Sequence, residues 1–207
     1  SNWGLVGDPA DQSNLIITKD RDELITVDNL KVAQFIYLLL NNSEIRNVLE
    51  TITSKVVLIL GRFTPERKEL LDAIRQEARR FNLVPVLFDF EKPRGHDTVE
   101  TIRTLASLAK FVIADLTDAK SVMQELQAIV PILPSLPVQP LIKRDQQEPG
   151  MFDHIQRIGQ NRVLPTVSYD SHDEMVKRLY ELVIEPPLER SRELSLELIQ
   201  LYGRSTS

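Results

Sequence analysis

The 207-residue chain contains no cysteine, which excludes disulfide bonds, thiol catalysis and cysteine-ligated metal sites. Its only histidines are His96, His154 and His172, and their spacing fits no zinc motif, so we expect no metal. Long apolar runs are absent, and no signal peptide opens the chain. These absences predict a cytoplasmic protein without a membrane partner.

Basic charge and glycine are also scarce. The formal net charge of −5 provides no basic surface, which argues against nucleic acid as the partner. The seven glycines form neither a GxGxxG nor a Walker motif, which argues against a standard dinucleotide or P-loop site. An apolar fraction of 42% is ordinary for a globular domain with one core.

Short apolar runs alternate with amphipathic helical stretches. Five strands are predicted, over residues 56–60, 84–88, 111–114, 138–142 and 163–167. Alternation at this spacing indicates parallel strands joined by right-handed helical crossovers. We therefore predict an α/β, flavodoxin-like three-layer fold with a five-stranded parallel sheet in the order 2-1-3-4-5 and flanking N- and C-terminal helices. The prolines in and around 138–142 predict an edge strand or a bent entry.

Outside the alternating region, composition and helical periodicity divide the chain further. A helical pair is expected ahead of the sheet, its second helix capped by Ser43. The adjacent Pro186 and Pro187 are expected to separate a final helix from the one before it. The expected parts are a linker or loosely ordered arm (1–24), a helical appendage (25–53), an α/β domain (54–187) and a C-terminal helix (188–207).

Acidic residues follow the third predicted strand. Asp115 comes at its carboxyl end, where open α/β sheets place their ligand sites. Ser121 and Gln124 have the spacing of a capping box, so Glu125 is expected in the opening turn of the next helix. Two or more carboxylates are thus predicted around one crevice.

The other strand ends contribute further candidates for the same crevice. These are Gly61, Arg62 and Phe63 after the first strand, Asp89 after the second, and Thr117 and Asp118 after the third. Such a mixture suits a nucleoside or nucleotide. Carboxylates accept hydrogen bonds from ribose hydroxyls, an arginine grips phosphate, and an aromatic ring stacks on a base.

Simpler roles are open for the same residues. Gly61 fits a tight turn, and Asp89 and Asp115 fit as acceptors for loop amides at strand ends. Asp118 is an alternative to Ser121 as the helix cap. Glu125 alone, near a helix N-terminus, would contribute only about 0.3–1 kcal/mol.

Two segments carry a family resemblance. Residues 112–117 (VIADLT) and 122–126 (VMQEL) resemble the signature of nucleoside 2-deoxyribosyltransferases and their TIR-like relatives. Residues 56–64 (VVLILGRFT) are similar to the first strand and loop of that family. The chain from Thr26 onward also resembles the domain that follows pentapeptide repeats in some bacterial proteins, which implies an upstream pentapeptide-repeat region.

The resemblance implies cleavage of an N-glycosidic bond in NAD or a related nucleotide or nucleoside. Glu125 would be the nucleophile or the stabiliser of the ribosyl centre, and Asp115 or Asp89 would hold ribose hydroxyls or assist the leaving base. NAD would be a substrate, so no cofactor is expected, and the family implies a homo-oligomer. The implied substrate-binding residues are Gly61, Arg62, Phe63, Thr117, Asp118 and Ser121.

The alternative is a non-catalytic module for nucleotide binding or for protein–protein signalling and assembly. Three departures from the family patterns support it. Ser121 stands where the transferases have asparagine, Gln127 stands where they usually have glycine, and Val122 and Met123 replace the TIR tryptophan–cysteine pair.

Overall fold

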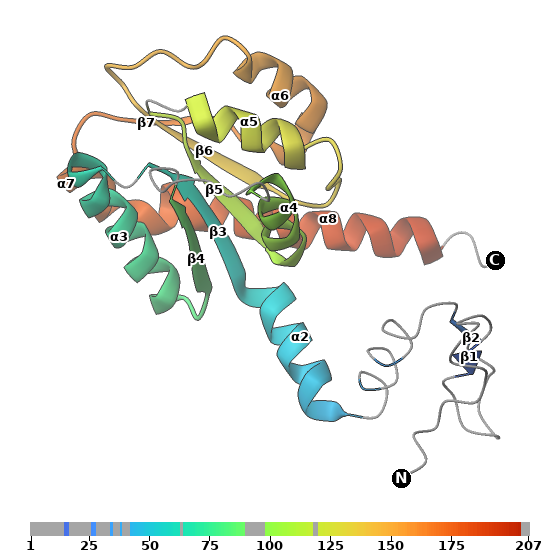
Figure 1. The fold of residues 1–207 in the computed structure, drawn as a ribbon. Coiled ribbons are helices and arrows are strands. Elements are labelled where there is room, and N and C mark those ends of the chain that lie inside the picture. Colours follow the sequence, from blue (N-terminus) through green and yellow to red (C-terminus); the bar gives the residue numbers. More distant parts are fainter. Residues whose placement is uncertain are drawn as a thin grey trace. The chain divides into compact units, whose positions relative to one another are not determined.

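The computed structural model describes residues 15–16, 26–27, 34, 38, 42–62, 64–89, 98–117 and 120–203 (Figure 1). The chain divides into two compact units, Ser1–Thr51 and Ile52–Ser207. In the first unit, β1 (Leu15–Ile16) pairs with β2 (Thr26–Val27) in antiparallel fashion. The first helix of the predicted N-terminal pair lies largely outside the described residues. None of the helices in the described part of the chain has the length and apolar character needed to span a bilayer.

Helix α2 (Ser43–Lys55) runs across the boundary between the units. Its N-cap is Asn42, whose Oδ1 accepts hydrogen bonds from the backbone N–H groups of Glu44 (2.9 Å) and Ile45 (3.2 Å). The prediction of Ser43 as the cap is therefore wrong by one residue. Asparagine caps at least as well as serine, because its side-chain oxygen satisfies helix N–H groups that lack a partner.

The second unit is built on a five-stranded parallel sheet. In spatial order the strands are β4 (Val84–Asp89), β3 (Val56–Gly61), β5 (Phe111–Asp115), β6 (Val138–Lys143) and β7 (Val167–Tyr169). Numbered along the chain within this sheet, the order is 2-1-3-4-5. The predicted flavodoxin-like architecture is confirmed.

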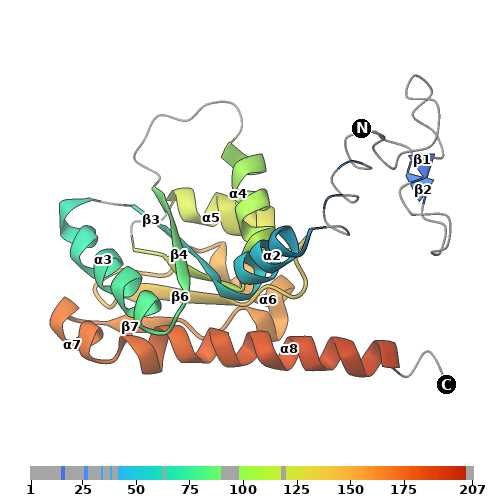
Figure 2. The ribbon, with the colours of Figure 1, turned by 90° about the horizontal axis from the view of Figure 1, so that it is seen from below.

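Helices cover both faces of this sheet (Figures 1 and 2). One face carries α4 (Thr98–Leu108), α5 (Lys120–Ile129) and α6 (Phe152–Gly159), which is followed by the short η1 (Gln160–Arg162). The other carries α3 (Pro65–Arg80), α7 (His172–Lys177), the π-helical η2 (Tyr180–Ile184) and α8 (Glu185–Gly203). The result is a three-layer unit.

Strand β3 shows how the sequence specifies two cores. Leu58 and Leu60 pack on the α4–α5–α6 face, while Val57 and Ile59 pack on the α3–α7 face. All four side chains are fully buried. A strand buried on both sides needs a continuous apolar run rather than an alternating one, which is what residues 56–60 provide.

The prolines of β6 do not make it an edge strand, because β6 lies between β5 and β7. Every second residue of this segment faces β5 with its backbone N–H and C=O: the carbonyls of Pro137 and Leu141, for example, accept hydrogen bonds from that side. Pro140 lies between these positions, so its nitrogen is on the β7 side. The β7 ladder starts only at Leu141, opposite Val167. The missing N–H of Pro140 therefore costs the sheet no ladder hydrogen bond.

Two further boundaries differ from the predictions. The expected fifth strand, 163–167, is replaced by β7 at Val167–Tyr169, and Val163 makes only an isolated bridge to Val138. Pro186 and Pro187 do not interrupt the chain's helical path, because they occupy the first turn of α8, directly after η2. Proline fits there because its fixed φ of about −65° is compatible with a helical backbone.

Candidate functional site

A pocket of about 530 Å³ opens where the loops after several strands meet. Parallel strands bring their carboxyl ends to one edge of the sheet, so residues that follow different strands converge there. The described lining residues are Arg62, Thr64, Arg67, Thr117, Lys143, Gln146 and His172. They come from the loop after β3, the first turn of α3, the loop after β5, the end of β6 and the start of α7.

Beneath this pocket, Arg67 forms a buried ion pair with Asp115. Arg67 is 7% exposed and Asp115 is 2% exposed. Both Nε (3.0 Å) and Nη2 of Arg67 donate to Oδ2 of Asp115. The second carboxylate oxygen, Oδ1, accepts the backbone N–H of Thr117 at 3.1 Å. Asp115 is therefore held by the turn that follows β5 while it holds an arginine from α3.

Tyr169 lies on another side of the same guanidinium. Cζ of Arg67 is 5.7 Å from the centroid of the Tyr169 ring, within the range of a cation–π contact. Tyr169 is only 4% exposed, and the side chains of Thr117 and Arg67 lie near its hydroxyl. Burial, and secondarily the negative charge of Asp115, raises the pKa of the Tyr169 phenol, because both disfavour the phenolate.

Lys143 ends β6 and contributes the third cationic side chain of the pocket. Its backbone N–H donates to Oγ1 of Thr117 at 3.0 Å, which ties the loop after β5 to the end of β6. Its ammonium group lies 2.9 Å from Asp145 and is substantially exposed, so this surface ion pair is weak.

His172 begins α7, where Ser171 is the N-cap and accepts the N–H of Glu174 at 3.3 Å. The imidazole lies 6.1 Å from the Tyr169 ring in a tilted arrangement. His172 also lines the pocket.

The electrostatic character of the described pocket wall is positive. Arg62, Arg67 and Lys143 contribute cationic groups, and no carboxylate is among the described lining residues. Asp115 behind Arg67 and Asp145 beside Lys143 offset part of this positive charge. The N-terminus of α3 adds the positive end of a helix dipole. Thr64 is the N-cap of that helix but makes no capping hydrogen bond with its side chain, so its hydroxyl is available to the pocket.

The predicted candidates divide into several groups. Arg62 and Thr117 line the pocket as expected. Gly61 ends β3, and a Cβ there would lie 3.3 Å from Leu71 of α3 and 3.4 Å from Cβ of Asp115. A side chain at this position would therefore require a small shift of the Leu71 side chain on α3.

Asp115 and Glu125, the two predicted carboxylates whose side chains are described, do not line this pocket. Asp115 lies beneath it in the ion pair with Arg67. Glu125 lies in α5, is 1% exposed, and does not appear in the pocket wall. Asp89 ends β4 opposite Gly61, and its side chain lies outside the described part.

Other candidates fall outside what the structure describes. Phe63 and Asp118 lie outside the described residues, as does His96. Ser121 lies inside α5, which begins at Lys120, so the predicted capping position is wrong by at least one residue, and nothing is described of its side chain. Phe63, Asp118 and Ser121 therefore stay predictions as site residues.

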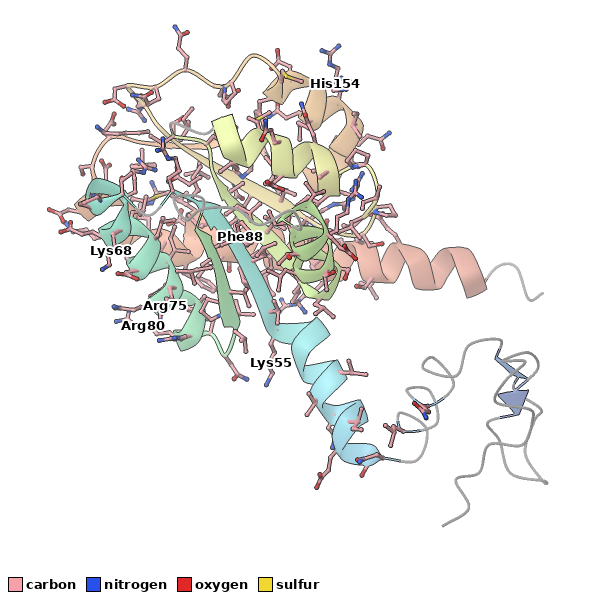
Figure 3. The ribbon with its side chains drawn as sticks, in the orientation of Figure 1. Lys55, Lys68, Arg75, Arg80, Phe88 and His154 are labelled. Atoms are coloured by element: carbon pink, nitrogen blue, oxygen red, sulfur yellow. The ribbon has the colours of Figure 1, made fainter. Side chains whose placement is uncertain are left out.

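The sequence interpretation missed Arg67, Lys143, Gln146 and His172. For Arg67 a signal was present: Leu70 and Leu71 follow at i+3 and i+4, which places Arg67 on the buried stripe of α3 rather than on its solvated face. By contrast, the Lys68 side chain is exposed on the outer side of α3 (Figure 3). No cluster of three or more metal-ligating side chains occurs within the described part of the chain.

Comparison with known proteins assigns no family to the chain. No family model matches the chain, and no curated protein matches it. Solved structures that match include a diflavin flavoprotein A3 from Nostoc sp. (TM-score 0.45, 11% identity, 70% of this chain and 96% of that one). A flavodoxin from the domain Archaea matches with a TM-score of 0.42 and 11% identity, over 68% of this chain and 99% of that one. A flavodoxin-like domain from a Synechococcus sp. protein matches with a TM-score of 0.43 and 10% identity, over 70% of this chain and 99% of that one.

These findings overturn the family interpretation. The matched structures are flavodoxin-like flavoprotein domains rather than TIR or deoxyribosyltransferase domains. The assignment of an N-glycosidic reaction on NAD, and of a protein without a cofactor, is wrong on the same comparison. The short VIADLT and VMQEL segments encode a buried strand, a turn and a helix start, a pattern that flavodoxin-like sheets share in general. At these identities the similarity concerns the fold and assigns no ligand to this chain.

Proposed function

We propose that the pocket at the carboxyl edge of the sheet binds a small molecule through a phosphate group. The observation that carries this proposal is the convergence of three cationic side chains, Arg62, Arg67 and Lys143, on one pocket wall. The carboxylates that pair with Arg67 and Lys143, Asp115 and Asp145, are not among the described lining residues. Arginine forks and lysine ammonium groups are the side chains that bind phosphate oxygens most effectively. The positive end of the α3 dipole and the hydroxyl donors of Thr64 and Thr117 would also favour an anion.

The size of the pocket supports a small ligand rather than a macromolecule. A volume of about 530 Å³ falls within the range of small-molecule sites. The described lining is cationic and polar, with the His172 imidazole as its one ring and with no aliphatic side chain. It therefore suits a phosphate, and does not by itself provide a surface for a large planar ring.

A flavin phosphate, the type of group that the names of the matched flavoproteins suggest, fits the described lining only in part. Arg62, Thr64, Arg67 and Lys143 fit its phosphate, whereas the described lining has no aromatic wall for the ring. The proposal therefore concerns recognition of the phosphate, and we derive no redox step from it.

Binding is tested with pairs of compounds that differ only in the phosphate. Ribose 5-phosphate is compared with ribose, and flavin mononucleotide with riboflavin, by isothermal titration calorimetry at low salt. We expect the phosphorylated member of at least one pair to bind, and its affinity to fall as NaCl is added because the charged groups are partly exposed.

Two pocket variants and one control locate the site. Arg62→Gln and Lys143→Gln should each weaken binding about tenfold, because a hydrogen bond to a charged group contributes about 1.5–3 kcal/mol and these side chains are partly solvated. Lys68→Gln makes the same change of charge on α3, outside the described pocket wall, and should leave the affinity unchanged. Equal binding of both members of every pair, or equal effects of all three variants, would contradict the proposal.

A further inference from the structure

Arg67 is both buried and part of the pocket wall, an unusual combination for an arginine. Its guanidinium has five N–H donors in a rigid planar fork. Nε–H and one N–H of Nη2 go to Oδ2 of Asp115. The edge of the fork that meets Asp115 is thereby fixed, and the rest of the guanidinium belongs to a residue that lines the pocket.

Asp115 is itself immobilised. It ends β5, and its other oxygen accepts the N–H of Thr117. Thr117 in turn accepts the N–H of Lys143 from the next strand. An acceptor held by two strand ends defines the position of its donor more narrowly than a carboxylate on a mobile loop would.

Tyr169 restricts the remaining freedom of Arg67. A ring centroid 5.7 Å from Cζ limits how the guanidinium can tilt or turn. Tyr169 is buried at the end of β7, and its ring also lies against His172. Arg67 is therefore held at its edge by Asp115 and supported on one side by Tyr169.

We propose that Asp115 and Tyr169 are positioning residues that hold the Arg67 fork in the orientation in which it binds a phosphate oxygen. This inference rests on the proposed function and deepens it, since it assigns recognition to an arginine organised in advance of binding. Asp115 does not touch the ligand in this arrangement. It acts through Arg67.

The sign of one effect separates this idea from simple electrostatics. Asp115 carries a negative charge close to an anion site, so its charge alone opposes anion binding. If charge were all that mattered, Asp115→Asn and Asp115→Ala would both bind phosphate more tightly. If Asp115 positions Arg67, both variants bind more weakly, and alanine more weakly than asparagine, because asparagine retains an oxygen that accepts from Arg67.

The experiment measures the affinity of inorganic phosphate by ³¹P NMR titration for the wild type, Asp115→Asn, Asp115→Ala and Lys68→Gln. We expect about a threefold loss for asparagine, about a tenfold loss for alanine and no change for the Lys68 control. A ¹H–¹⁵N spectrum supplies a second readout, since the Nε–H signal of Arg67 should be sharp in the wild type and lost or broadened in Asp115→Ala. Tyr169→Leu is compared with Tyr169→Phe, which keeps the ring, and should bind phosphate more weakly than it.

The outcomes are distinct. Weaker binding in the expected order, with loss of the Arg67 signal, supports the inference, and the Tyr169 comparison decides it if the Asp115 variants do not fold. Unchanged or tighter phosphate binding in Asp115→Asn overturns the positioning role but leaves the proposed function standing. A wild-type protein that does not bind phosphate overturns both.

Discussion

The buried Arg67–Asp115 pair makes a quantitative prediction about stability. Arg67→Met removes the cation but leaves the carboxylate of Asp115, which is 2% exposed, without its charged partner. Breaking one side of a buried ion pair costs about 3–5 kcal/mol, because the remaining charge is neither solvated nor compensated. We expect the free energy of unfolding to fall by about that amount.

The double variant Arg67→Met/Asp115→Asn should recover most of the loss. It removes both charges. The asparagine oxygen can still accept the Thr117 N–H, which in the wild type donates to Oδ1 of Asp115 at 3.1 Å. Replacing both members of a buried pair by neutral groups of similar size is often nearly neutral, so a net loss of about 1 kcal/mol is expected. The double variant should then be about 2–4 kcal/mol more stable than Arg67→Met alone.

Urea unfolding at fixed pH compares the wild type with Arg67→Met, Asp115→Asn and the double variant, and Arg80→Met is the matched control. Arg80 pairs with Glu77 at 3.0 Å, but the Arg80 side chain is 75% exposed, so its loss should cost at most about 1 kcal/mol. If Arg67→Met costs no more than Arg80→Met, or if the double variant shows the sum of two single losses, the buried pair does not act as described.

Two further predictions concern α6 and Tyr169. Gly159→Ala should lower the free energy of unfolding, measured in urea, by about 1–3 kcal/mol, because the added Cβ would lie 2.2 Å from Cγ2 of Val163. Adding Val163→Ala in the same chain should restore part of that loss. Because the pKa of Tyr169 is raised in the folded state, the unfolded chain loses this proton first, so wild-type stability should fall as pH rises above the ordinary value of 10.0. Tyr169→Phe should fall less steeply over the same range in urea titrations, and identical slopes would contradict the assigned burial effect.

The strand order could be predicted because its signals are local. Five apolar runs separated by helical stretches leave few parallel arrangements, and the buried runs around Leu58 and Ile113 are the clearest of them. Proline positions were harder to interpret. Pro140 is tolerated because the ladder of a neighbouring strand starts one residue later, and this fact depends on pairing that the sequence does not state.

The site was only partly predictable. Residues directly after strands, such as Arg62 and Thr117, were found because the carboxyl edge of a parallel sheet collects them. Arg67 was missed because a charged residue on a helix is usually solvated, and only its position relative to Leu70 and Leu71 marks it as inward-facing. Asp115 was found, but its partner could not be, since the two residues are 48 positions apart.

That separation in sequence has a kinetic consequence. The Arg67–Asp115 contact joins the helix after β3 to the end of β5, so it can form only once the non-local pairing of these strands is in place. Contacts that form late in folding stabilise the native state chiefly by slowing unfolding. A phosphate held by Arg67 would therefore lengthen the lifetime of the folded chain while leaving its folding rate nearly unchanged.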